Sequence, residues 1–70
     1  MVEFGDTVVT HLTEGKHHRN DVFVCLYDNM YGRVVGKVQL QGSGDYAYHV
    51  RLEPNGNVLL FKEDELEVIN

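Results

Sequence analysis

Tryptophan is absent from this 70-residue chain, and cysteine and proline occur once each. A single cysteine excludes an internal disulfide, and Cys25 lies within an apolar run, which predicts a buried thiol in a reducing compartment. The longest apolar run is six residues, far shorter than the roughly 20 that a membrane helix needs. The first residues lack the basic start and apolar stretch of a signal peptide. These absences predict a cytoplasmic protein with no membrane association.

Basic residues are scarce, because six Lys and Arg stand against eleven Asp and Glu, a formal charge of −5. Nucleic-acid binding depends on Lys and Arg that neutralise phosphates, so the composition disfavours it. The only local basic cluster is the stretch Lys16 to Arg19. An accessory module that binds nucleic acid, or modulates a nucleic-acid enzyme, remains the alternative function. It predicts salt-sensitive binding through Lys16, Arg19, Arg33 and Lys37.

Short strand-like segments separated by turn residues fill most of the sequence. A chain of this length supports a single core, so residues 1–70 are predicted to form one domain. Alternating or β-branched segments predict strands, and Asn55-Gly56 is a strong hairpin signal. The predicted strands cover residues 6–12, 33–41, 46–53, 58–62 and 67–69, with hairpins at 41–46 and 53–58.

Three features refine this prediction. Gly36, midway along the longest strand, is the expected point of a sharp bend. Residues 63–66 have the pattern of a single helical turn, with acids at its start. Residues 13–20 are polar and predict a loop, whereas the apolar run 22–27 fits either a short buried strand or the inner arm of a long folded loop. The chain is therefore predicted to be all-β: a small SH3-like barrel of five or six short strands with one helical turn before the last strand.

Three stretches resemble known sequences. The opening FGDTVV, the middle GRVVGKV and the ending FKEDELEVI look like the framework of prokaryotic SH3-like barrels. The ending also resembles small uncharacterised proteins of phages and prophages, the YorP-like group. This resemblance implies the barrel fold and a phage or prophage origin.

The last fifteen residues, 56–70, also resemble the end of the plasmid-borne type II dihydrofolate reductases. Those enzymes are SH3-like barrels that assemble as tetramers around a central active-site pore. The glutamine and tyrosine with which the family handles its ligands are replaced here by Leu59 and Phe61. The resemblance therefore implies the fold and not reductase activity. The matching residues are Gly56, Val58, Leu66, Glu67, Ile69 and Asn70.

The apolar run Val58 to Phe61 places large side chains on both faces of a strand. One face must enter the core. The other is covered either by the long segment 13–32 or by a neighbouring protein, including a second copy of the chain. Leu59 and Phe61 are thus candidate interface residues. Tyr27 and Tyr31, which flank a turn, are the other two candidates.

No pattern predicts a catalytic residue, a cofactor site or a metal site. His17 and His18 with Asp21 lack the four-ligand spacing of zinc sites and are expected to be solvated. Tyr46 and Tyr48 are expected to pack at the edge of the core, and the acidic run 63–65 to form a solvated cap on the turn. The sequence therefore favours a non-enzymatic module that acts by contact with an unknown protein or with itself.

Overall fold

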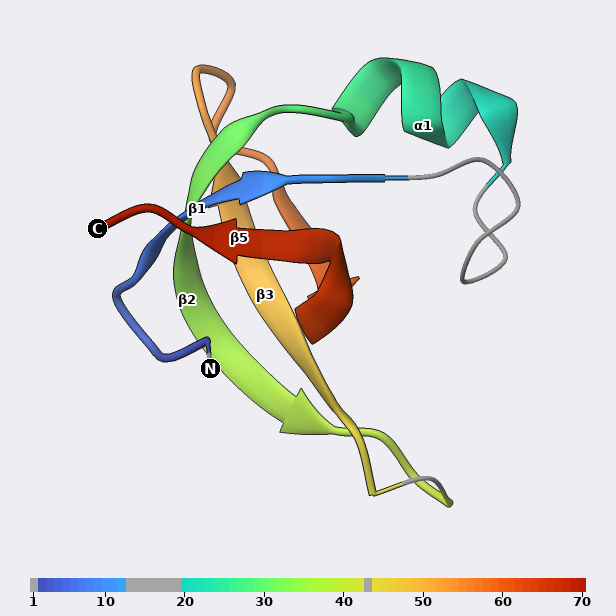
Figure 1. Cartoon of the computed structure of the whole chain (residues 1–70), viewed down its shortest axis with the longest axis vertical. Coiled ribbons are helices and arrows are strands. Elements are labelled where there is room, and N and C mark those ends of the chain that lie inside the picture. Colours follow the sequence, from blue (N-terminus) through green and yellow to red (C-terminus); the bar gives the residue numbers. More distant parts are fainter. Residues whose placement is uncertain (1, 13–19, 43) are drawn as a thin grey trace.

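The structure is a computed structural model that describes residues 2–12, 20–42 and 44–70. Its five strands form one antiparallel sheet in the order β4-β3-β2-β1-β5. This sheet confirms the predicted fold class in its strands and their hairpin connections (Figure 1). The strands are β1 (Thr7–Thr10), β2 (Tyr31–Gln39), β3 (Tyr46–Leu52), β4 (Val58–Lys62) and β5 (Leu66–Val68).

The sheet is strongly coiled, because β2 bends along its length (Figure 1). The register between β2 and β3 shifts between Val34 and Gly36, which marks a bulge at the predicted bend. The two edge strands β4 and β5 are joined by the short 3₁₀ helix η2 (Glu63–Glu65), the predicted helical turn. The sheet thus curls on itself, with η2 connecting its two edges.

The prediction for residues 22–27 is wrong, because they belong to a helix, α1 (Asp21–Tyr27). The Asn20 side chain caps this helix, since its Oδ1 atom accepts a hydrogen bond of 2.8 Å from the backbone N–H of Phe23. Asp21 in the first turn adds a favourable charge. The chain is therefore mostly β, with one short helix beside its sheet. Most of the predicted loop 13–20 lies outside the described residues.

The core lies on the inner face of the coiled sheet. Its largest buried side chains include Tyr48, Leu52 and Phe61. The helix α1 covers part of this core, and the Phe23 ring lies 6.2 Å from the Phe61 ring, centroid to centroid. The helix α1 thus packs on the core side of β4, whereas the first of the two alternatives placed segment 13–32 over the other face of the strand, where Val58 and Leu60 are exposed. The core comprises Val2, Val8, Leu12, Val34, Tyr48, Val50, Leu52 and Phe61.

Thr10 holds the end of α1 against the sheet. Its hydroxyl is buried, donates a 2.6 Å hydrogen bond to the Tyr27 carbonyl and accepts a 2.9 Å bond from the Met30 N–H. The Asp28 carboxylate also accepts a hydrogen bond from the backbone N–H of Leu12. Because these bonds satisfy polar groups at the end of the helix, they fix where the chain enters β2.

Candidate functional site

The structure places the sequence-predicted interface residues Leu59 and Phe61 on the inner face of β4. Phe61 is only 1% exposed and lies opposite Tyr48, whereas Leu59 is half-buried and packs against the core. A partner cannot reach Phe61, so this pair stabilises the fold instead. The exposed side chains of β4 are their neighbours Val58 and Leu60, at 49% and 40% exposure.

The two candidate tyrosines do not form one site. Tyr27 is half-buried in α1, and its ring lies 4.7 Å from the Phe23 ring, centroid to centroid. It therefore helps to seat the helix on the core. Tyr31 begins β2 and is 60% exposed. Of the four candidate interface residues, only Tyr31 presents a largely exposed side chain.

A different set of side chains meets on the outer face of the sheet. Strand register pairs Arg33 with Arg51 and Arg51 with Val58. Because side chains two residues apart in a strand share a face, His49 and Leu60, which pair with each other, join this side. Tyr31 joins it as well, two residues before Arg33. We define the outer face as Tyr31, Arg33, His49, Arg51, Val58 and Leu60.

Local sequence explains this arrangement. The alternation in YHVRL directs Tyr48, Val50 and Leu52 inward and therefore His49 and Arg51 outward. Gly36 leaves room for the His49 ring, since a Cβ atom at Gly36 would lie 3.1 Å from its Cδ2 atom. The alternation of this strand is visible in the sequence. The position of its outer residues beside Val58 and Leu60 follows only from the pairing of β3 with β4.

The electrostatics of the outer face are unusual for an acidic protein. Arg33 and Arg51 are both exposed and stand directly opposite each other, an arrangement that destabilises a sheet. In the described part of the chain, His11 forms an ion pair with Glu67, whereas neither Arg33 nor Arg51 forms one with a described carboxylate. Two arginines that form no ion pair with a described carboxylate, and that have Tyr31, Val58 and Leu60 beside them, form a surface suited to an anionic, partly apolar ligand.

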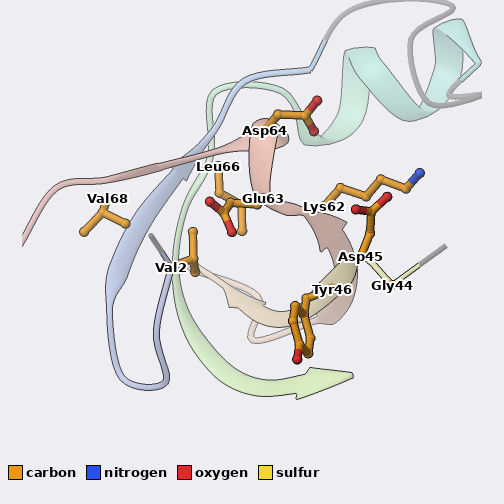
Figure 2. A pocket seen from close by; sticks show the side chains of 9 residues that line it. All are labelled: Val2, Gly44, Asp45, Tyr46, Lys62, Glu63, Asp64, Leu66 and Val68. Carbon is orange, nitrogen blue, oxygen red and sulfur yellow. The ribbon is translucent and has the colours of Figure 1, made fainter. Parts of the chain in front are cut away.

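A second feature is a cleft of about 650 Å³ between η2, β5 and the end of the β2–β3 hairpin. Figure 2 shows the side chains of Val2, Glu63 and Leu66 pointing into a common space. The carboxylates of Asp45, Glu63 and Asp64 make this cleft acidic, although Lys62 also lines it. The cleft and the outer face therefore carry opposite charge.

Hydrogen bonds beside the cleft stabilise η2. The Tyr48 hydroxyl donates a 3.2 Å hydrogen bond to the Glu63 carboxylate. Burial, this hydrogen bond and the negative charge of Glu63 raise the pKa of the Tyr48 phenol above its ordinary value. Glu65 is 2% exposed and accepts a hydrogen bond from the Lys62 N–H. The expectation of a solvated acidic cap is thus wrong for Glu65, whose carboxylate closes the turn.

The remaining candidates for chemistry are dispersed. Cys25 is exposed on α1, contrary to the prediction of a buried thiol. His11, which follows β1, contacts Glu67, and His49 lies on β3. His17 and His18 lie outside the described residues. Within residues 2–12, 20–42 and 44–70, no three His, Cys, Asp or Glu side chains gather as metal ligands would.

Comparison with known proteins gives no assignment. The chain matches no protein-family model, no curated protein and no solved structure. In the described part of the chain, no helix has the length and apolar character needed to span a membrane. Inference about function therefore depends on the surfaces themselves.

Proposed function

We propose that this chain is a non-enzymatic interaction module that acts by protein–protein contact through its outer face. The observation that carries the proposal is the grouping of exposed Tyr31, Val58 and Leu60 around the two exposed arginines. Aromatic and arginine side chains are enriched at the centres of protein interfaces. Aliphatic neighbours supply apolar area that a partner can remove from water.

The nucleic-acid alternative receives less support. Its proposed basic residues do not act together, because Arg33 lies on the outer face whereas Lys37 pairs with inward-facing Tyr48. The Lys37 ammonium instead lies 4.1 Å from the centroid of the Tyr46 ring. Lys16 and Arg19 lie outside the described residues. With a formal charge of −5, the chain offers only a small positive area to phosphates.

The proposal also covers the compartment and the origin of the protein. The protein acts in the cytoplasm, where its single thiol stays reduced. It is encoded by a phage or prophage, as the resemblance of its framework stretches implies. The neighbouring genes in the source genome test this origin directly, since phage structural or regulatory genes would flank it.

Capture of partners by immobilised protein tests the function. Val58→Ser together with Leu60→Ser removes apolar area from the outer face without opening the core. The matched control is Val22→Ser with Leu26→Ser, because these two α1 side chains are also well exposed, at 67% and 60%. The proposal predicts that a partner of the wild type is lost in the first variant and kept in the control.

Circular dichroism and thermal melting establish that both variants fold. Equal capture by the outer-face variant and the wild type would contradict the proposal. Loss only in the α1 control would move the contact surface to the helix. Loss of capture in neither variant would leave the outer face without a role in binding.

A further inference from the structure

We infer that the outer face selects a partner segment in which carboxylates alternate with apolar side chains, and that Arg33 and Arg51 determine this selectivity. The inference rests on the proposed function and adds the chemistry of the partner. Its basis is a pair of like charges placed together in the middle of the sheet. Such a pair opposes folding, and an anionic partner removes the repulsion.

The charged groups around this pair form no ion pair with it in the described part of the chain. Thr7 and Val58, the other cross-strand neighbours of the two arginines, carry no charge. Glu67, on β5, contacts His11 instead. Glu53 is exposed and shares the outer face, because it follows Arg51 by two residues and pairs with Tyr31 through a 2.9 Å backbone hydrogen bond, but it forms no ion pair with either arginine.

The side chain of Arg51 lies close to Gly56. Its Nε and Nη2 atoms lie 3.5 and 3.6 Å from the position that a Cβ atom would take at Gly56. The guanidinium thus lies over the β3–β4 turn, beside Val58. The planar fork of the guanidinium suits a carboxylate.

The apolar neighbours define the rest of the ligand. Val58 and Leu60 stand along one edge of the outer face, and Tyr31 stands beyond the arginines. A highly charged polyanion would leave these side chains in contact with water. A segment that alternates carboxylate and apolar side chains satisfies both parts of the surface.

Self-association through this face is opposed by the same charges. A two-fold symmetric contact places identical patches against each other, so four arginines would meet at its centre. A head-to-tail contact remains, in which the acidic cleft of one copy faces the arginines of the next. Because such a head-to-tail contact does not close into a ring, the assemblies should grow with protein concentration.

Fluorescence anisotropy with defined probes tests the inference. The probes are a capped peptide of alternating glutamate and leucine, its lysine–leucine counterpart and single-stranded DNA. We expect the acidic peptide to bind most tightly. Arg51→Gln should weaken the binding of the acidic peptide about tenfold, the usual cost at an interface centre. Adding Arg33→Gln to this variant should weaken the binding further. Raising ionic strength from about 0.1 M to about 1 M should also weaken it.

Lys37→Gln is the matched control, because it removes one positive charge from the inner side of the sheet. The inference fails if this variant loses as much affinity as Arg51→Gln, if the lysine–leucine peptide binds equally well, or if DNA is preferred. It fails equally if the acidic peptide does not bind. If sedimentation shows that the wild type assembles and that the arginine substitutions abolish assembly, the ligand of the outer face is a second copy of the chain and not an acidic partner.

The same variants separate this inference from the proposed function. If the double Val58→Ser, Leu60→Ser variant loses its captured partner while Arg33→Gln with Arg51→Gln keeps it, the face binds protein but the arginines do not select it. If neither double variant changes capture, both statements fall. Arg51→Lys distinguishes charge from geometry, because only the fork of arginine binds a carboxylate through two parallel bonds.

Discussion

Two adjacent residues of β4 should respond very differently to truncation. Phe61 is 1% exposed and Leu60 is 40% exposed, although both are large apolar residues in the same run. Phe61→Ala should cost about 3–5 kcal/mol, because it removes a buried ring and leaves a cavity beside Tyr48. A domain of this size has roughly 3–5 kcal/mol of stability from its core. Phe61→Ala should therefore be largely unfolded in water.

Leu60→Ala should lose about 1 kcal/mol, below the roughly 1.5–3 kcal/mol of a fully buried leucine, since much of the Leu60 side chain already contacts water. Urea denaturation followed by circular dichroism and tyrosine fluorescence measures both. Phe61→Leu, which conserves more volume, supplies an intermediate that still folds. Equal losses at positions 60 and 61, or a larger loss at 60, would show that the faces of β4 have been assigned the wrong way round.

Three further predictions follow from single sites. Arg51→Gln should raise the free energy of unfolding by about 0.2–1 kcal/mol, because it removes a like-charge cross-strand pair; an unchanged or lower urea midpoint would contradict this. Gly32→Ala should cost about 1–3 kcal/mol, because its Cβ atom would lie 2.6 Å from Val50 Cγ1, and a wild-type melting curve would refute it. The raised pKa of Tyr48 means that the folded protein holds this proton more tightly than the unfolded chain does. Its contribution to stability is thus present below about pH 10 and is lost as pH rises through the folded-state pKa. Tyr48→Phe should flatten this alkaline decline in melts at several pH values, and an equally steep decline would exclude Tyr48 as its source.

Most of the sheet could be predicted from the sequence because its signals are local. Alternation places 46–53 in a strand, Asn55-Gly56 specifies the following hairpin, and the acids after Lys62 indicate the helical turn. Gly36 marks the bulge for the same reason, since a residue without a side chain stands where the register shifts.

The helix α1 could not be predicted from the composition of its residues. Its sequence DVFVCLY is rich in β-branched and aromatic residues, which favour strands. The deciding signals were Asn20 as the capping residue and Asp21 in the first turn. Packing of Phe23 and Tyr27 on the core then stabilises a helix too short to persist alone.

The candidate site was missed for a different physical reason. Four successive apolar residues, Val58 to Phe61, fit a strand in either orientation, and a shift of one residue exchanges the two faces. Only the tertiary pairing of Phe61 with Tyr48 and of Val58 with Arg51 decides between them. The sequence therefore predicts the strand correctly, but the interface residues predicted from it, Leu59 and Phe61, lie on its inner face.

Site-specific photo-crosslinking tests the central claim most directly. Benzoylphenylalanine is introduced at the position of Val58, on the outer face, and in a separate protein at that of Leu26, which is also well exposed on α1. The outer-face proposal predicts that a defined partner is crosslinked from position 58 only. The inferred selectivity of the two arginines predicts in addition that Arg33→Gln with Arg51→Gln abolishes the product. A partner crosslinked from position 26 alone, or from neither position while still captured by the wild type, would contradict it.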